Sequence, residues 1–221
     1  MNEYNLSPQC NYSIEEKNVK LVYEVIANHF SQTRFSVWSN VKEFIDLFKK
    51  NELIADIGCG NGKNMFRDDL NYIGIDFCKS FINICNNNIN NTNKQFILGN
   101  ILNIPIRNNS CDGVISVAVI HHLSTFNLRK KAVEELIRIT KPAGKILIEV
   151  WAFENSKYKT QDTMINWTHR QKNIKPKKYE RYYHLFIKDE LLDLIPNNLV
   201  EITKQYNIYN NWVIELKKIS K

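Results

Sequence analysis

The sequence lacks any apolar run near the roughly 20 residues that a membrane-spanning helix needs. Its first residues contain neither the basic patch nor the apolar segment of a secretory signal peptide. Both absences argue against an integral membrane protein and against export. We therefore expect a soluble, cytoplasmic protein that does not associate with a membrane.

Cysteine, glycine and proline are also sparse, with five, seven and five residues among 221. The cysteines form no C-x-x-C pair and have no histidine at ligand spacing, so we expect reduced thiols and no metal site. No Gly-, Pro- or Ser-rich linker divides the chain, and a hydrophobic share of 43% is enough for one core. We expect a single domain over 1–221. The cysteines are Cys10, Cys59, Cys78, Cys85 and Cys111.

Positive charge is concentrated in the C-terminal part of the chain. Residues 1–128 contain 11 Lys and Arg against 12 Asp and Glu, whereas 129–221 contain 19 against 11. Within the second part, 157–181 interleaves basic residues with Tyr158 and Trp167. Cations beside aromatic rings are typical of a surface for single-stranded nucleic acid, and a solvated Lys-rich loop is the alternative. The candidate contacts with RNA in this stretch are Lys175, Lys177 and Lys178.

Apolar periodicity predicts that helices and strands alternate. A capping box at Ser13 and Glu16 starts a helix that ends near Asn28. Further helices are expected near 37–48, 78–87 and 127–140. Short apolar runs predict strands at 53–57, 72–75, 95–98, 113–117 and 145–150. This order favours a doubly wound, mostly parallel α/β sheet, completed by a C-terminal antiparallel hairpin of about 199–207 and 212–218.

Three of the seven glycines fall in one loop after the first predicted strand, in the pattern Asp56-x-Gly58-x-Gly60-x-Gly62. Glycines at a strand-to-helix turn let the backbone bend sharply and approach a ligand. A dinucleotide site favours G-x-G-x-x-G instead, and Asp56 would repel a pyrophosphate but could hold a cationic amino group. Asp76, at the tip of the second predicted strand, can accept hydrogen bonds from a ribose diol. A purely structural turn would leave both carboxylates unexplained.

This glycine pattern resembles the first motif of class I S-adenosylmethionine-dependent methyltransferases, which have a Rossmann-like fold of the predicted kind. The resemblance implies S-adenosylmethionine as the cofactor. It also implies that Asn100 stands where many members carry an Asp that binds the adenine amino group, and that Ile101 packs on the adenine. The cofactor-binding residues that it implies are Asp56, Gly58, Gly60, Gly62, Asp76, Asn100, Ile101 and Ser116.

Rarer strings narrow the substrate further. They occur in one order along nearly the whole chain, at 26–34, 115–122, 151–152, 181–186 and 211–213. Together they resemble the eukaryotic tRNA wobble-uridine carboxymethyl O-methyltransferases. That family methylates the carboxylate of 5-carboxymethyluridine in the tRNA anticodon loop, giving the methyl ester, and works with a small zinc-binding activator subunit. The resemblance further implies N-terminal helices (1–50) that cap the cofactor site and a basic substrate-binding insert (152–181).

The chemistry of this reaction requires positioning more than a base, because a carboxylate is already ionised at neutral pH. Arg34 and Arg181 are the candidates to grip the carboxylate or a flanking phosphate. His121 or His122 can donate a hydrogen bond, and we expect one of the two in the pocket because neighbours at a strand end face opposite ways. The candidates to stack on the uracil or on a neighbouring base are Trp151 and Tyr183. Core packing is the alternative role for Trp151, and a satisfied hydrogen bond in a turn is the alternative for the histidines.

Two other functions stay open on the sequence alone. A small-molecule methyltransferase of the quinone or sterol kind shares the glycine loop but has no use for the basic stretch. A non-catalytic RNA-binding scaffold with this fold is favoured by Asn100 only. Measurements of tRNA binding and of cofactor binding distinguish these two functions from tRNA methylation.

The strand at 95–98 is the expected contact with the activator. It follows a polar Asn-rich run and is expected at one edge of the sheet, with unpaired backbone groups. A partner strand could pair with Phe96–Leu98, and we expect the Ile97 N–H to donate at that edge.

Overall fold

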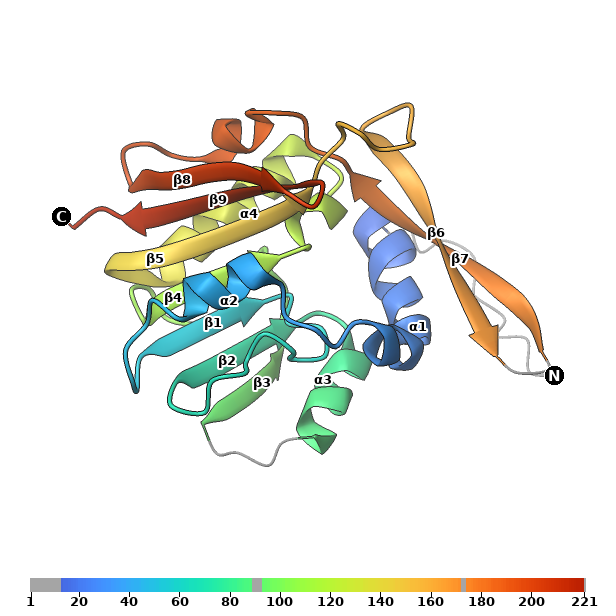
Figure 1. Cartoon of the computed structure of the whole chain (residues 1–221), viewed down its shortest axis with the longest axis horizontal. Coiled ribbons are helices and arrows are strands. Elements are labelled where there is room, and N and C mark those ends of the chain that lie inside the picture. The colour runs from blue at the N-terminus through green and yellow to red at the C-terminus, as the bar shows by residue number, and fades with distance from the viewer. Residues whose placement is uncertain (1–12, 89–92, 172–173, 221) are drawn as a thin grey trace.

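The computed structural model describes residues 13–88, 93–171 and 174–220, and at 169–171 and 174–175 it describes the backbone alone. Cys10 and the centre of the Asn-rich run lie outside the described residues. Strands of the described residues form a seven-stranded sheet in the order β3-β2-β1-β4-β5-β9-β8 and a separate pair, β6-β7 (Figure 1). The large sheet consists of β1 (Leu53–Ile57), β2 (Asn71–Asp76), β3 (Lys94–Leu98), β4 (Cys111–Val117), β5 (Thr140–Trp151), β8 (Val200–Ile208) and β9 (Asn211–Lys218).

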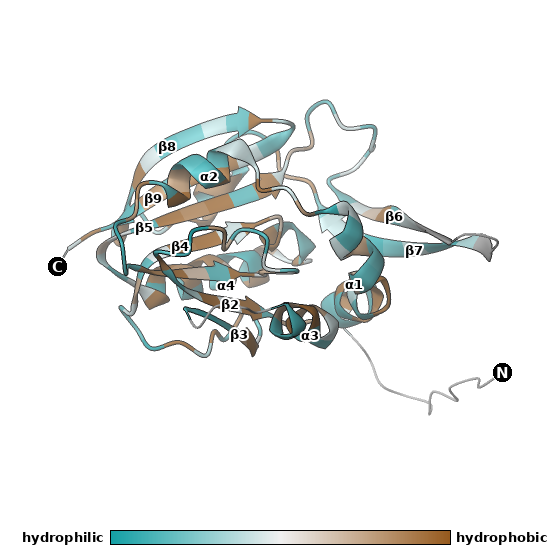
Figure 2. Ribbon diagram, turned by 60° about the horizontal axis from the view of Figure 1, so that its bottom comes forward, coloured by the Kyte–Doolittle hydropathy of each residue, from teal (hydrophilic) through white to brown (hydrophobic). Residues whose placement is uncertain are grey.

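Helices cover both faces of this sheet. In Figure 1, α2 (Ser39–Ile45) lies in front and α4 (Phe126–Ile139) behind. Successive strand residues alternate between the two layers: Ile54 packs in the cluster of α2, and Ala55 packs in the cluster of α4. Apolar residues therefore dominate the inner strands β4 and β5, whereas the edge strand β8 is mostly polar (Figure 2).

The carboxyl ends of the parallel strands meet a second group of elements. A short π-helix η1 (Glu16–Lys20) leads into α1 (Leu21–Thr33). Helix α1 packs against α3 (Lys79–Asn87) and against the hairpin of β6 (Asp162–Gln171) and β7 (Ile174–His184). Ile26, Trp167 and Tyr182 are buried in the shared cluster. Two short turns, η2 (Ile120–His122) and η3 (Glu190–Leu194), complete the chain.

The base of the hairpin is fixed by a charged network. The His184 ring lies between two carboxylates, with Nδ1 2.9 Å from Asp162 and Nε2 2.6 Å from Glu190. The Tyr182 hydroxyl also donates to Asp162. Because Glu190 belongs to η3, this network holds the end of β7 beside the large sheet.

The expected doubly wound, mostly parallel sheet is confirmed. The five predicted parallel strands are present, and β8 and β9 form the expected antiparallel hairpin. Ser13 accepts a hydrogen bond from the Glu16 N–H, as the capping box predicts. The first helix continues to Thr33 rather than ending near Asn28.

The alternative of a Lys-rich loop at 157–181 is wrong for the backbone of this stretch. Most of this stretch forms β6 and β7, which pair antiparallel over almost their whole length. The basal residues of β7, from Arg181 to His184, are all buried, so this half of the strand shows no alternation of polar and apolar residues. In the outer half of β7, Lys177 and Lys178 are exposed. Exposed lysines give this part of the strand a composition similar to that of a loop.

The expected edge strand is confirmed, but one detail is wrong. β3 lies at the edge of the sheet, beside β2. The Gly99 N–H donates to the Asp76 carbonyl and the Asn93 carbonyl accepts from Tyr72, so residues 93, 95, 97 and 99 face β2. The Ile97 N–H is therefore used inside the sheet, and the alternate residues Lys94, Phe96 and Leu98 direct their backbone groups outward.

No helix among the described residues is long and apolar enough to cross a membrane.

Candidate active site

A cavity of about 210 Å³, called here the first cavity, lies at the carboxyl ends of β1, β2 and β4. The glycine loop that follows β1 forms one wall of it. Gly58, Gly60 and Gly62 all have φ between +52° and +82°, a region that disfavours other residues. A Cβ on Gly58 would lie 2.2 Å from Val119, and one on Gly62 would lie 3.1 Å from the Phe96 ring. Gly58 and Gly60 line the cavity, whereas Gly62 is not part of its lining.

Asp76 lines the same wall from the end of β2. Its two carboxylate oxygens accept hydrogen bonds from the Gly60 N–H and the Cys78 N–H, each at 2.9 Å. Burial raises the pKa of Asp76 to about 6, although these hydrogen bonds oppose the shift. A carboxylate oxygen has further lone pairs, so Asp76 can still accept from a ligand hydroxyl.

Asp56 and Ser116 do not reach the cavity surface. Asp56 is 1% exposed, with one oxygen accepting from Asn64 at 3.2 Å and the other without a partner in the described residues. Burial raises the pKa of Asp56 to about 7. Ser116 is fully buried, and its hydroxyl likewise has no partner there. Asn64 connects Asp56 to the lining, because Asn64 itself lines the cavity.

Asn100 and Ile101, which the resemblance places beside the adenine, line the cavity after β3. The Asn100 side-chain oxygen already accepts from the Leu102 N–H at 2.9 Å. An amide oxygen has two lone pairs, so one acceptor position stays available. Ile101 is 9% exposed and offers an apolar surface.

Arg181 enters the opposite end of the cavity from β7. It is 4% exposed, and its guanidinium lies between 5.1 and 5.5 Å from the ring centres of Tyr23, Trp167 and Tyr183. No carboxylate of the described residues lies within ion-pair distance of it, and its Nε has no hydrogen-bond partner there. A desolvated cation without a counter-charge is costly, so this geometry favours an anionic ligand.

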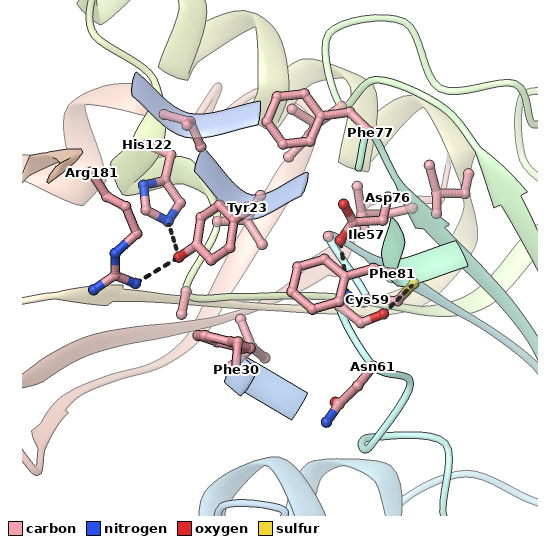
Figure 3. Close-up of a pocket in the computed structure, with 18 of the residues that line it drawn as sticks. Tyr23, Phe30, Ile57, Cys59, Asn61, Asp76, Phe77, Phe81, His122 and Arg181 are labelled. Carbon is pink, nitrogen blue, oxygen red and sulfur yellow. Dashed lines mark hydrogen bonds between the residues drawn. The ribbon is translucent and has the colours of Figure 1, made fainter. Parts of the chain in front are cut away.

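A chain of hydrogen bonds orients Arg181 (Figure 3). A guanidinium N–H donates to the Tyr23 hydroxyl oxygen at 3.0 Å, and Tyr23 lies 3.1 Å from His122 Nε2. His122 Nδ1 lies 2.8 Å from the Tyr182 carbonyl, which only accepts, so Nδ1 carries the proton and Tyr23 donates to Nε2. Burial lowers the pKa of His122 to about 3, with Arg181 adding to the shift. His122 is therefore neutral.

The two adjacent histidines differ in placement. His122 lines the cavity, whereas His121 is fully buried outside its lining. They lie in the 3-10 turn η2 rather than at a strand end, so the reasoning from strand alternation does not apply. His121 Nδ1 accepts from the Trp151 N–H at 3.2 Å, and its ring stacks on Tyr183 at 4.7 Å. His121 thus supports Trp151 and Tyr183, which both line the cavity.

The remaining predicted residues lie at the rim or beyond it. Arg34 lines the cavity with an exposed side chain, 5.5 Å over the Trp167 ring. Lys177 and Lys178 are exposed on the outer part of β7 and do not line the cavity. The Lys175 side chain lies outside the described residues.

Sequence reasoning missed the aromatic wall of this cavity. Tyr23 falls inside the first predicted helix, and its role depends on contacts with residues 99 and 158 positions away. Phe30, Phe81 and Trp167 also line the cavity. The one available signal was that a buried tyrosine hydroxyl needs a partner.

Cys59 also lines the cavity but is not a nucleophile. A hydrogen bond with the Cys85 thiol, together with burial, raises the pKa of Cys59 well above its usual range. It is therefore a thiol at neutral pH. Among the described residues, no group of three or more His, Cys, Asp or Glu side chains is arranged to hold a metal ion.

Comparison with known proteins identifies relatives of this chain. A family model described as "Methyltransferase domain" matches residues 55–148. A tRNA (carboxymethyluridine(34)-5-O)-methyltransferase of Arabidopsis thaliana is 42% identical over 158 residues, covering 70% of this chain and 37% of that protein. The mouse enzyme of that name, ALKBH8, is 42% identical over 151 residues, covering 67% of this chain and 22% of its own length. The chain thus spans well under half of both proteins.

Other similarities cover whole proteins. Among solved structures, a S-adenosylmethionine-dependent methyltransferase of Clostridium acetobutylicum has a TM-score of 0.71 at 12% identity, with 90% and 99% of the two chains covered. A putative methyltransferase in complex with the Haloferax volcanii Trm112 activator has a TM-score of 0.69 at 15% identity, with 92% and 98% covered. The Schizosaccharomyces pombe enzyme with the same name as the plant relative is 34% identical over 227 residues, 92% of this chain and 97% of that protein. This chain belongs to the family of the tRNA (carboxymethyluridine(34)-5-O)-methyltransferases.

Proposed function

We propose that this chain transfers the methyl group of S-adenosylmethionine to the carboxylate of 5-carboxymethyluridine at the wobble position of tRNA. The product is the methyl ester, 5-methoxycarbonylmethyluridine. The observation that carries this proposal is Arg181, a buried guanidinium in the cavity wall that lacks a carboxylate partner among the described residues. The carboxylate of the substrate supplies the missing counter-charge. The names of the relatives favour neither a small-molecule methyltransferase nor a non-catalytic scaffold.

The residues at the other end of the cavity fit the cofactor. Gly58 and Gly60 offer backbone without side chains, Asp76 offers acceptors for the ribose hydroxyls, and Asn100 and Ile101 offer an acceptor and an apolar face for adenine. Asp56 lies behind this lining, where Asn64 connects it to the cavity, and its carboxyl group adds to the acidic character of this side. When bound, S-adenosylmethionine supplies a methyl group on a positively charged sulfur.

The protein contributes orientation and desolvation to the reaction rather than proton transfer. The substrate carboxylate is ionised at pH 7 and needs no base. Both ring nitrogens of His122 are committed, one to Tyr182 and one to Tyr23, so His122 is a positioning residue for Arg181 and not a general base. The rings of Phe30, Phe81 and Trp167 limit the access of water to the carboxylate.

The N-terminal helices and the insert of 152–181 have separate roles in this proposal. The N-terminal helices within 1–50 close over the first cavity, because Tyr23 and Phe30 of α1 line it. The insert of 152–181 receives the RNA. Lys177 and Lys178 lie on the exposed half of β7, where they can approach phosphates of the anticodon stem-loop.

We further propose that a zinc-binding activator adds a strand to the open edge of β3. Support comes from the outward backbone groups of Phe96 and Leu98 and from the Trm112 complex of the archaeal protein with the same fold. Leu98→Pro removes an outward donor and should abolish co-purification with the activator, whereas Leu98→Ala should preserve it. An intact complex with Leu98→Pro would place the interface elsewhere.

Nucleoside mass spectrometry tests the reaction itself. Carboxymethylated tRNA is incubated with S-adenosylmethionine and the protein, alone and with a zinc-binding activator. The methyl ester should accumulate on the wobble uridine and on no other nucleoside. Absence of the ester with every preparation, while the protein binds S-adenosylhomocysteine, would refute the proposed substrate.

A further inference from the structure

A second cavity, of about 420 Å³, lies next to the first and is not explained by the cofactor or by the methylated uridine. This volume is within the range of about 300–1,000 Å³ typical of ligand sites. Arg34, Trp38 and Trp151 line both cavities, so the two lie side by side. A polymer with one unit in the first cavity therefore has its next unit within reach of the second.

The lining of the second cavity has the composition of a site for a nucleotide. Trp38, Trp151, Tyr158 and Tyr209 contribute aromatic rings. Its charged residues are cationic, Arg34 and Lys157, and among the described residues no acidic side chain lines it. Rings that stack on a base beside cations that attract phosphate are the elements of single-strand recognition.

Among the residues of this lining, Tyr209 gives the strongest indication of a ligand. It lies in the β8–β9 turn, which Figure 1 shows at the same end of the sheet as the β6–β7 hairpin. Tyr209 and Asn210 both have positive φ, +50° and +60°, which suits Asn but disfavours tyrosine. The Tyr209 side chain is also 79% exposed, so its packing in the protein does not explain it. A disfavoured backbone combined with an exposed ring points to a ligand.

The turn is held in a fixed position relative to the first cavity. The Ala152 N–H donates to the Asn210 carbonyl at 2.9 Å, and Asn211 pairs with Trp151 across β9 and β5. The backbone of the turn that carries Tyr209 is thus held beside Trp151, which is one of the residues that line both cavities.

We propose that the second cavity binds a nucleotide adjacent to the methylated uridine, with its base stacked on Tyr209 and its phosphate beside Arg34 and Lys157. This inference rests on the proposed function, because it takes the uridine to occupy the first cavity. It adds that the protein recognises a neighbouring anticodon base by stacking.

The test uses three short single-stranded RNAs that contain a central uridine: one intact, one lacking the base on the 5′ side and one lacking the base on the 3′ side. Fluorescence anisotropy measures the affinity of each for the purified protein. Loss of at least one neighbouring base should weaken binding of the unchanged protein by about fivefold or more, the lower limit for base–aromatic stacking.

Substitutions at Tyr209 assign the effect to the ring. Tyr209→Asn should bind the intact RNA about fivefold or more weakly and should no longer distinguish it from the RNAs with a missing base, while Tyr209→Phe should behave as the unchanged protein. Asn suits a positive φ, so Tyr209→Asn should melt at the same temperature or higher, which excludes unfolding as the cause. Phe126→Ala, which removes an exposed ring of α4 outside both cavities, is the matched control and should have no effect.

Two results overturn the inference: equal binding of all three RNAs by the unchanged protein, or discrimination that persists in Tyr209→Asn. Neither depends on methyl transfer. If the protein binds the RNAs with this discrimination but forms no methyl ester on carboxymethylated tRNA, the proposed substrate fails and the nucleotide site stands.

Discussion

The two ends of the first cavity are built by different means. The end proposed for the cofactor, called here the cofactor end, consists largely of backbone, with the loop at 58–62 held by hydrogen bonds to Asp76 and to the end of β2. The end proposed for the substrate, called here the substrate end, consists of side chains from separate elements, Tyr23 of α1, His122 of η2 and Arg181 of β7. The first end is encoded in one short motif, whereas the second exists only once the chain has folded.

The two ends also differ in the charge that they bury. The cofactor end contains Asp56 and Asp76, whose pKa values burial raises to about 7 and about 6. The substrate end contains Arg181 without a carboxylate among the described residues. An acidic end suits the proposed cationic cofactor and a basic end suits the proposed anionic acceptor, so this difference in charge supports the proposed places of the two ligands.

The largest expected effect follows from Arg181→Met, which removes the charge and keeps an unbranched apolar side chain. We expect kcat/KM for carboxymethylated tRNA to fall about 30-fold to several thousandfold. This corresponds to about 2–5 kcal/mol of lost binding free energy in the transition state, as for loss of one partner of a buried charge pair. Affinity for S-adenosylhomocysteine should stay unchanged in calorimetry, since the cofactor end is untouched. A parallel loss of cofactor affinity would contradict the separation of the two ends.

Asp76→Ala should have the opposite signature. Removal of charge-assisted hydrogen bonds should lower affinity for S-adenosylhomocysteine by about 1.5–3 kcal/mol, or about 10- to 150-fold. Asp112→Ala is the matched control, because Asp112 also accepts from a backbone N–H, that of Leu53, but does not line the cavity. Equal losses in both variants would show that Asp76 only supports the backbone.

Asp56→Asn should stabilise the cofactor-free protein. Because the pKa of Asp56 is raised in the folded chain, Asp56 keeps its proton there up to about pH 7, whereas in the unfolded chain it loses the proton near pH 4. Between these pH values the folded chain binds one more proton, so the free energy of unfolding falls as pH rises. The variant should therefore gain up to about 4 kcal/mol at pH 8 and only about 1.5 kcal/mol at pH 5. Thermal unfolding at the two pH values measures this, with the exposed Asp46→Asn as control. A gain of equal size at both pH values would argue against a raised pKa.

The smallest expected effect concerns the outer half of the hairpin. Changing Lys177 and Lys178 together to Ala should reduce the salt dependence of tRNA binding by up to about two phosphate contacts and leave cofactor affinity unchanged. Lys49 and Lys50, an exposed pair beyond α2, give a control with the same change of charge. An unchanged salt slope would make the outer hairpin a solvated surface.

The sequence predicted the fold because its parallel strands are short apolar runs and its turns are marked by glycine or capping residues. The same local signals identified the loop at 58–62 and Asp76. They did not identify β6 and β7, because the base of β7 is buried on both sides and includes Arg181 and His184 at positions that usually hold apolar residues. They also missed Tyr209, whose exposed ring and positive φ are properties of the folded turn.

The most direct test of the account is whether Arg181 recognises the negative charge of its substrate. Equilibrium binding is measured, with S-adenosylhomocysteine present, for tRNA that carries 5-carboxymethyluridine and for tRNA that carries the uncharged amide, 5-carbamoylmethyluridine. The unchanged protein should prefer the carboxylate by about 30-fold or more, and Arg181→Met should bind the two tRNAs equally. Equal affinity of the unchanged protein for both, or a preference that survives in Arg181→Met, would contradict the assignment of this buried cation to the substrate carboxylate.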